Sequence, residues 1–496
     1  MTPASLGIDL GTSATKVGLY AAGDGRQLAL SSQSYDLASP ESGWAELDAE
    51  EYWRAVGCGV RDVLRRAPSV DVVAMGLSSQ GQTFVCLDSD DQPLRPAIAW
   101  LDARAHREAA EVRERLGAQA FRRRTGLPEP SAIDSLSKIL WLRRHEPTTM
   151  ERCRRALLLP AFIALRLTSR AVCDPANGAS TGMLDRLTGE WWHEALALCT
   201  LPAQAMGEVA PARSVAGELT PDAAGALGLA PGIPVAVGTN DQYAGALAVG
   251  NREPGRLSGT LGTAMPLLAT VEDAAPFEGS GLLLAPHPLG SGWFAMAYTK
   301  TAAACLDWLR RILDDTAGTG LLVDEAMALA PGAGGVTCIP HLTGISTPSF
   351  DDSVRGGFLG LSLGHGRAHL VRAAMEAVCF SARDSLALLG SVGRDWSEIT
   401  LTGGATASTD WMSMLADVLG ITVRVTDAPE AACRGAALLG LLASGDEGAL
   451  DWPAGSPQGD VAYQPNPSVA GAYDTAYSGY VQAMDALYPG ARRGGS

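Results

Sequence analysis

Two short segments far apart in this chain share one pattern: a strand, a turn of glycine and hydroxyl residues, and a second strand. The first copy has the apolar run Leu6–Leu10, the turn 11–13 and the alternating run Thr15–Tyr20. The second copy, at 256–264, repeats the glycine–threonine turn. Apolar runs separated by such turns are typical of strands joined as hairpins. The repeat therefore predicts two similar halves, each beginning with a hairpin.

Strands and helices alternate after each hairpin. The apolar spacing over Asp48–Arg66 predicts a helix, which Asp48 can cap and whose first turn is acidic. In the first half we expect strands at Gln27–Ser34, Val70–Leu77, Thr83–Leu87 and Ile233–Val237, with a mostly helical stretch over 103–172. In the second half we expect a strand at Ile399–Thr402 and helices at Thr301–Ile312, Ala368–Leu389 and Trp411–Leu419. This alternation predicts an α/β layer architecture.

The chain has 496 residues, which is too long for one ordinary domain. The polar, turn-rich stretch 251–255 marks a boundary between the two halves. The tail after Ala449 is rich in proline and glycine and holds one last helix near Ala472–Leu487. We therefore expect a first domain at 1–250, a second at 251–449, and a C-terminal tail at 450–496.

Charge and composition exclude several classes of protein. With 38 basic and 54 acidic residues the net charge is −16, so there is no broad basic surface for nucleic acid or an anionic membrane. No apolar run reaches the roughly 18 residues of a membrane span, and the start has no secretory pattern. The nine cysteines are single and lack metal or redox spacing, which suits a reducing cytoplasm. His365 and His369 are four apart but lack an obvious carboxylate partner, so a metal site there is not expected.

Two familiar catalytic motifs do not fit. A Walker-A loop needs a lysine directly after glycine, and none of the three lysines follows one. The single G-x-S-x-G, at 178–182, follows the loop-like stretch 174–177 and not a strand, so it is a poor nucleophile elbow.

The turn after Asp9 can carry phosphate chemistry. Gly11 lets backbone N–H groups approach a phosphate, and the hydroxyls of Thr12 and Ser13 add donors. Asp9 is an acceptor when ionised and suits a Mg²⁺ ion with its water shell. The alternative is a polar hairpin whose aspartate bonds its own turn. The second copy favours the phosphate function, because two such hairpins could clamp a triphosphate. Lys16 could meet phosphate or only solvent.

Asp241 follows the strand at Ile233–Val237, where ligands of α/β sheets bind. It could accept the proton of a substrate hydroxyl as that oxygen attacks a γ-phosphorus. Alternatively, Asn240 or Asp241 caps a helix that begins at Gln242. Taken by itself, the pattern favours the cap.

At these positions the sequence resembles the FGGY carbohydrate kinases of the actin, sugar-kinase and Hsp70 ATPase superfamily, from Leu6 to about Ala443. The most specific match is Gly356–Leu361 followed, after seven residues, by His369–Glu376. The segments Asp9–Ser13, Trp100–Arg104, Asp241-Gln242 and Gly403–Ala405 stand in the expected order. The resemblance implies two RNase-H-like α/β domains, with ATP and a sugar in the cleft between them. Closure of that cleft would exclude water from the phosphoryl group.

The resemblance also implies roles for individual residues. Asp241 corresponds to the catalytic base and Asp9 to the aspartate that serves Mg²⁺ and phosphate. The phosphate hairpins would comprise Thr12, Ser13, Lys16, Gly259, Thr260, Gly262 and Thr263. The loop on the adenosine side would comprise Gly403, Gly404, Ala405 and Ser408. A homodimer would be unsurprising for the family.

Sugar identity should be set near Gly81 and Gln82, with Gln242, Trp100 and Arg104 as further candidates for sugar contact. Glycerol kinases have Gln-Arg-Glu-Thr where this chain has Gln-Gly-Gln-Thr, and xylulokinases have Gln-Met-His-Gly. A second departure is the Ile-Ser pair at 345–346, where many xylulokinases have Glu-Arg. Trp100 could stack on a sugar or belong to the core, which is the favoured alternative; Arg104 could contact substrate or pair with Asp102.

These observations predict ATP-dependent phosphorylation of a sugar hydroxyl, with a pentulose such as D-xylulose as substrate. The alternatives are a kinase of another polyol, ketose or sugar acid, and a non-enzymatic nucleotide switch like actin or Hsp70.

Overall fold

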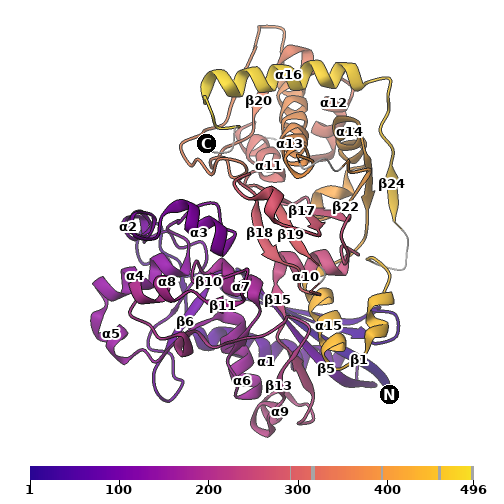
Figure 1. Ribbon diagram of the computed structural model, residues 1–496. Helices are drawn as coiled ribbons and strands as arrows, with labels where there is room; N and C mark the ends of the chain where they lie inside the picture. Colours follow the sequence, from indigo (N-terminus) through magenta and orange to yellow (C-terminus); the bar gives the residue numbers. More distant parts are fainter. Residues whose placement is uncertain (291, 314–318, 392–394, 456–459, 493–496) are drawn as a thin grey trace. The chain divides into compact units, whose positions relative to one another are not determined.

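The computed structural model describes residues 1–290, 292–313, 319–391, 395–455 and 460–492. The chain divides into two compact units (Figure 1). Unit 1 comprises 1–252, 284–293 and 430–457, and unit 2 comprises 253–283, 294–429 and 458–496. The segment 430–457 thus packs with unit 1, although the sequence pattern assigns it mainly to a second domain at 251–449. That division of the sequence stays a prediction.

Unit 1 is built on a mixed sheet in the order β13-β14-β5-β1-β2-β3. The hairpin β1 (Thr2–Leu10) and β2 (Ala14–Ala21) continues antiparallel into β3 (Gln27–Ser34). On the other side, β5 (Val70–Ser79) runs parallel to β1, and β14 (Pro234–Ala236) and β15 (Thr239–Asn240) run parallel to β5. The edge strand β13 (Val215–Glu218) is antiparallel to β14. The strands predicted for this half are confirmed, with ends that shift by a few residues.

The two faces of this sheet pack on different helices because side chains alternate along a strand. Leu6 and Ile8 of β1 share a core cluster with Val56 of α1 (Ala49–Arg66), the helix predicted to be capped by Asp48. The Asp48 side chain does accept a hydrogen bond from the Glu50 N–H. On the opposite face, α15 (Ala431–Ala443) packs on β1 and β5, and α10 (Asp241–Ala248) packs against α15.

The face under α15 is made of small residues. A Cβ atom on Gly7 would stand 1.9 Å from the Cys433 carbonyl oxygen, and one on Gly76 would stand 1.8 Å from that of Ala436. Helix backbone therefore lies directly on strand backbone.

The stretch from 103 to 172 is mostly helical, as predicted. It forms a second core cluster beside a four-stranded sheet of order β4-β7-β6-β8. Its helices are α2 (His106–Leu116), α3 (Ala118–Thr125), α4 (Ser135–His145), α5 (Pro147–Arg152) and α6 (Leu159–Thr168). The strands of the four-stranded sheet are β4 (Glu46–Leu47), β6 (Phe84–Leu87), β7 (Ala97–Ile98) and β8 (Arg155–Leu158). Smaller elements of unit 1 are β9 (Val172–Cys173), α7 (Pro175–Ser180), β10 (Leu184–Asp185), β11 (Glu190–Trp191), α8 (His193–Leu198), β12 (Glu208–Val209) and α9 (Pro221–Leu227). The stretch 174–177 is not the loop expected there, because Asp174 caps α7 and residues 175–177 are its first turn.

Unit 2 repeats the topology. Its sheet has the order β18-β19-β17-β16-β22-β23-β24, so β19-β17-β16-β22-β23 corresponds to β3-β2-β1-β5-β14 of unit 1. The strands of this sheet are β16 (Leu257–Thr260), β17 (Met265–Val271), β18 (Leu283–Pro286, of which 284–286 fall in the unit 1 segment 284–293), β19 (Trp293–Thr299), β22 (Glu398–Thr402), β23 (Thr422–Val425) and β24 (Val461–Tyr463). A separate pair is formed by β20 (Thr337–Ile339) and β21 (Gly357–Leu359). The helices are α11 (Ala303–Ile312), α12 (Thr319–Met327), α13 (Arg367–Leu389), α14 (Thr409–Leu419) and α16 (Ala470–Leu487). The two similar halves predicted from the repeat are confirmed.

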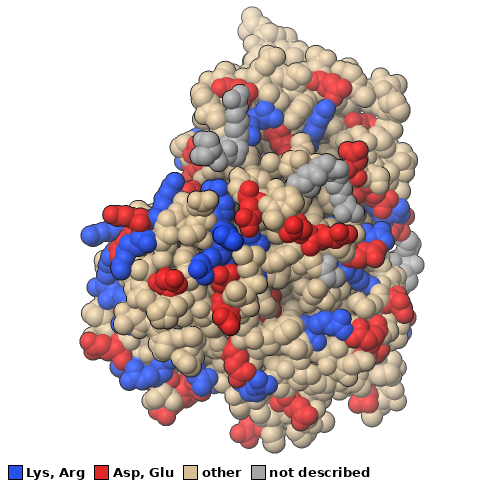
Figure 2. All heavy atoms as spheres, in the orientation of Figure 1, with Lys and Arg blue, Asp and Glu red and all other residues tan. Residues whose placement is uncertain are grey.

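Basic side chains on the face drawn in Figure 2 gather over α2–α5 of unit 1, with acidic side chains among them. Several are paired: Arg113 contacts Glu129, and Arg144 contacts both Glu108 and Glu111. Part of the positive charge of this cluster is therefore balanced by neighbouring carboxylates. Among the described residues, no helix is both long and apolar enough to cross a membrane.

The close packing of α15 predicts a large effect of one methyl group. Gly76→Ala should destabilise the protein by about 1–3 kcal/mol, the cost of overpacking, because the new Cβ meets helix backbone that cannot turn aside. The midpoint of urea unfolding measures this. Gly23→Ala is the matched control, since a Cβ there meets nothing within 4 Å. Equal midpoints for the two variants would contradict this account of the contact.

Candidate active site

Two carboxylates of unit 1 lie at one edge of its sheet because three parallel strands end there. Asp9 is paired with Ser78 across β1 and β5, and Ser78 is paired with Thr239 across β5 and β15. Asp241 follows two residues after Thr239. The carboxyl ends of β1, β5 and β15 thus bring Asp9 and Asp241 to the same edge, where α/β sheets bind ligands.

The two carboxylates influence each other. The pKa of Asp241 is raised to about 7, mainly by burial and also by the nearby charge of Asp9. Burial also raises the pKa of Asp9, which is 7% exposed, while a hydrogen bond from the Ser78 hydroxyl at 2.7 Å opposes that shift. Like charges close together disfavour double ionisation, which places a group with a pKa near neutrality at this edge.

The cap at the start of α10 is mainly the work of Asn240. Its side chain accepts a hydrogen bond from the Gln242 N–H at 3.0 Å, and the Asp241 carboxylate accepts from the same N–H at 2.7 Å. Asp241 is the first helical residue and only half-buried. Asn240 is therefore the residue that caps α10, while the Asp241 side chain remains partly exposed at the site.

Hydrogen bonds to its backbone hold the turn after Asp9, while its hydroxyl residues remain partly or fully exposed. The Gly11 carbonyl accepts hydrogen bonds from the Tyr35 hydroxyl at 2.6 Å and the Gln80 amide at 3.2 Å. Thr12 is half-buried and Ser13 is exposed. The structure therefore presents these two hydroxyl residues on a rigid turn. Lys16, the other candidate here, forms an ion pair with Glu430 at 2.6 Å.

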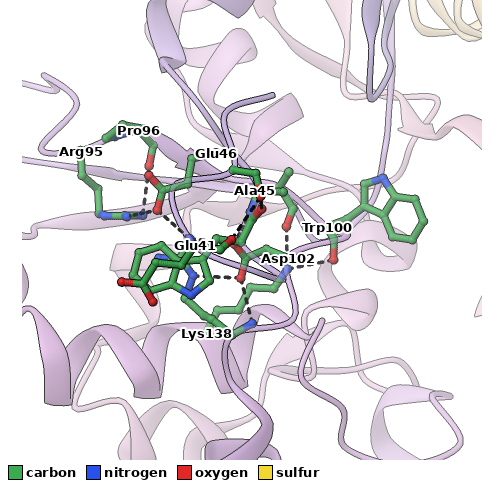
Figure 3. A network of polar contacts seen from close by, with 12 residues as sticks. Glu41, Ala45, Glu46, Arg95, Pro96, Trp100, Asp102 and Lys138 are labelled. Carbon is green, nitrogen blue, oxygen red and sulfur yellow. Dashed lines mark hydrogen bonds and ion pairs between the residues drawn. The ribbon is translucent and has the colours of Figure 1, made fainter. Parts of the chain in front are cut away.

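Trp100 lies beside this turn and is only half-buried, so it is not the core residue that the sequence favoured. Its indole N–H donates to the Thr12 hydroxyl at 2.8 Å. Its carbonyl accepts from the Lys138 ammonium at 3.0 Å, and the Ala99 carbonyl does so at 2.8 Å. In Figure 3 the indole is directed away from the buried polar network, while the carbonyl faces Lys138. Trp100 thus joins the first turn to the Gln82 side of the site.

Arg104 lies in that buried network, behind Trp100. Its side chain is 0% exposed and donates to both Asp102 and Glu46, and its guanidinium lies over the Trp44 ring at 3.6 Å. Asp102 also accepts from the Ala45 N–H at 2.6 Å (Figure 3). Arg104 therefore holds the loop 99–104 in place, the structural alternative weighed for it.

Gln82 has a strained backbone, with a φ of 60°. The Ser135 hydroxyl donates to its carbonyl at 2.8 Å, and its side-chain amide donates to the Asp134 carboxylate at 3.2 Å. A Cβ on the preceding Gly81 would stand 3.2 Å from the Asn240 amide nitrogen. Gly81 and Gln82 therefore lie next to the start of α10, which carries Asp241 and the half-buried Gln242.

In unit 2 the second turn and the Gly403 loop lie together. The Leu261 carbonyl accepts from the Ala405 N–H at 3.3 Å, and the Leu261 N–H donates to the Thr402 carbonyl at 2.7 Å. Gly403 has a φ of 108°, and a Cβ there would stand 2.4 Å from the Leu261 carbonyl oxygen, so the contact requires glycine. The residues brought together are Gly259, Thr260, Gly262 and Thr263 with Gly403, Gly404 and Ala405, while Ser408 caps α14.

The acidic residues present fit a magnesium ion held largely by water and phosphate. The described residues contain no group of three or more His, Cys, Asp or Glu side chains able to hold a metal. Asp9 binds Ser78 through one oxygen, and within the described structure its other oxygen accepts no hydrogen bond. Mg²⁺ commonly uses one or two carboxylates plus waters and substrate phosphates, and Asp9 supplies one such carboxylate.

Comparison with known proteins gives the family. The N-terminal domain model of the FGGY family of carbohydrate kinases matches residues 4–248, and the C-terminal domain model matches 258–444. A xylulose kinase of Escherichia coli (strain K12) is 30% identical over 416 residues, 84% of each chain. A gluconokinase of Bacillus subtilis (strain 168) is 27% identical over 463 residues, 91% of this chain and 90% of that one.

A solved structure agrees with this. The xylulose kinase of Rhodospirillum rubrum superposes with a TM-score of 0.91 at 28% identity, covering 99% of this chain and 100% of the other. The chain belongs to the FGGY family of carbohydrate kinases, and it is a phosphotransferase of that family.

Three further buried residues lie around the site and were not predicted from the sequence: Asp134, Lys138 and Asp174. Asp174 accepts a hydrogen bond from Thr239, and Lys138 holds the Trp100 loop. Asp134 and Asp174 both precede short helices, so in the sequence each resembles an ordinary cap. A signal was present for Lys138, because this lysine directly precedes the apolar run Ile139–Leu142.

Arg104→Ala should destabilise the protein by about 3–5 kcal/mol, because it leaves Asp102 buried without its charge partner. It should also raise the KM for the sugar, since the loop that carries Trp100 loses its anchor. Urea unfolding and steady-state kinetics measure the two effects. Arg113→Ala is the control: its pair with Glu129 is exposed and should contribute less than about 1 kcal/mol. A loss at Arg104 no larger than at Arg113 would contradict the argument.

Proposed function

We propose that this chain transfers the γ-phosphoryl group of ATP to a hydroxyl of a small sugar, with a pentulose such as D-xylulose as substrate and Asp241 as general base. The observation that carries the proposal is the meeting of Asp9 and Asp241 at the edge formed by β1, β5 and β15. Family membership supplies the reaction class, and the site residues supply the roles.

Asp241 is suited to accept a proton near neutral pH. A base works best when its pKa is close to the pH at which it operates, and burial with the Asp9 charge brings Asp241 to about 7. The proton leaves the sugar hydroxyl for Asp241, the hydroxyl oxygen bonds to the γ-phosphorus, and the bond from that phosphorus to the β–γ bridging oxygen breaks. ADP carries away the bridging oxygen, and Asp241 later releases its proton to water.

Phosphate would be held by backbone N–H groups and hydroxyls. Each unit contributes one turn of glycine and hydroxyl residues, Thr12-Ser13 in unit 1 and Gly262-Thr263 in unit 2. Mg²⁺, when bound, supplies positive charge to the phosphates, and Asp9 is the residue that would hold it. The Gly403 loop of unit 2 would lie against the adenosine.

Asp241→Asn should lower kcat by about 10²- to 10⁴-fold, the usual contribution of a general base, because the amide cannot take the hydroxyl proton. ATP binding, measured by calorimetry, should remain. The control is Asp71→Asn, an exposed residue of β5 away from the site edge, which should keep full activity. Wild-type rates in Asp241→Asn would remove the proposed base.

The rate should depend on pH through Asp241. Only the ionised carboxylate accepts a proton, so kcat/KM at low ATP should fall about tenfold per pH unit below about 7 and level off above it. A pH series with intrinsic fluorescence as a check on folding measures this. A rate that is flat from about pH 5.5 to 8.5 would show that another group, or none, limits proton transfer.

A further inference from the structure

A second buried carboxylate lies directly against the proposed sugar-contact residue. Asp134 is 3% exposed and accepts three hydrogen bonds: from the Gln82 amide at 3.2 Å, and from the Ser131 N–H and hydroxyl at 2.8 and 3.1 Å. Although it precedes α4, its side chain makes no capping hydrogen bond. Capping of the helix therefore does not explain why a carboxylate is buried at this position.

The carboxylate decides which way the Gln82 amide faces. An ionised carboxylate only accepts hydrogen bonds, so the amide must turn its NH₂ toward Asp134. The amide oxygen of Gln82 is thereby left for a partner other than Asp134. Among the described residues this oxygen accepts no hydrogen bond. Gln82 thus offers a hydrogen-bond acceptor, backed by a buried negative charge.

The backbone around Gln82 is held just as firmly. A φ of 60° is costly for glutamine and persists only when the surroundings enforce it. Here the Ser135 hydroxyl bonds the Gln82 carbonyl, from the first residue of the helix that Asp134 precedes. The contact between Gly81 and Asn240 places this assembly beside Asp241. Strain of this kind next to a proposed base is typical of a binding site.

We propose that Asp134 is a positioning residue that fixes the Gln82 amide with its oxygen toward the substrate, and that this pair selects neutral ketoses and polyols over sugar acids. The proposal rests on the sugar-kinase function above and deepens it. A hydroxyl can donate to the Gln82 oxygen, whereas the carboxylate of an aldonate cannot donate and is repelled by Asp134. The Gln82–Asp134 pair would therefore favour a pentulose over gluconate, the two kinds of substrate for which the similar proteins are named.

The charges around Asp134 bear on its ionisation. Burial raises its pKa to about 7, the Ser131 hydrogen bonds lower it, Lys138 of α4 lowers it, and Glu129 raises it. Above pH 7 the anion fixes the amide as described. Below pH 7 a protonated Asp134 can donate to the Gln82 oxygen, so the amide is free to turn and the barrier to sugar acids weakens.

The experiment measures kcat/KM with Mg-ATP for D-xylulose and for D-gluconate in the full-length protein. The wild type should favour D-xylulose by at least about 100-fold at pH 8, because a site built around one hydrogen bond rejects a ligand that leaves it unpaired. Asp134→Asn should narrow this ratio by about tenfold, since asparagine can donate and the charge is gone. Asp185→Asn, a buried aspartate paired with Arg124, is the control and should leave the ratio unchanged.

The pH dependence of the ratio of the two kcat/KM values is a measurement that a purely structural role of Asp134 would not change. Both sugars use the same base, so the Asp241 dependence cancels in the ratio, and gluconate stays ionised throughout. The wild-type ratio should narrow as pH falls through about 7, and the Asp134→Asn ratio should not change with pH. Gln82→Met, which removes the acceptor but keeps the shape, should reduce kcat/KM for D-xylulose and serves if Asp134→Asn does not fold.

The outcomes separate this proposal from the function on which it rests. A wild type that phosphorylates neither these sugars nor other ketoses and polyols overturns the proposed function and this inference with it. An active wild type that prefers gluconate, or one whose ratio is unchanged by pH and by Asp134→Asn, overturns the role of Asp134 and leaves the kinase function standing.

Discussion

The parallel pairing of β1, β5 and β15 is the constraint on which the site depends. Two carboxylates that repel each other, Asp9 and Asp241, come together because the strands that carry them end at one edge of the sheet. The sheet is rigid, with backbone hydrogen bonds on both sides of β5, so both carboxylates stay at this edge, where burial first and the Asp9 charge second raise the pKa of Asp241. The free energy of folding thus maintains a carboxylate with a pKa near neutrality at the position of the proposed base.

The surroundings of the site are held by buried polar groups. Trp100 lies on a loop fixed by Lys138 on one side and by Asp102 with Arg104 on the other. Such networks cost free energy to bury and are useful where position matters, because their hydrogen bonds form together only in one arrangement. The Gln82–Asp134 pair follows the same principle at the point proposed to meet the sugar.

Much of this fold could be predicted from the sequence, and the reason is local. The hairpin at Leu6–Tyr20, its repeat at 256–264 and the helix after Asp48 each carry their signal within a few residues. Asp134 could not be found in this way, since its proposed role depends on a hydrogen bond from Gln82, which is far away in the chain. The prediction that Trp100 belongs to the core differs from the structure for a similar reason. Its half-buried indole donates a hydrogen bond to Thr12, a partner that no local pattern indicates.

The packing of α15 has a consequence for how the protein is made. Its backbone lies against Gly7 and Gly76, so one face of the N-terminal sheet stays uncovered until residues 431–443 exist. On a ribosome, synthesis of nearly the whole polypeptide precedes completion of that layer. The nascent chain must therefore carry this sheet with one face of small residues uncovered through most of translation, a period in which incompletely packed surfaces are prone to aggregate.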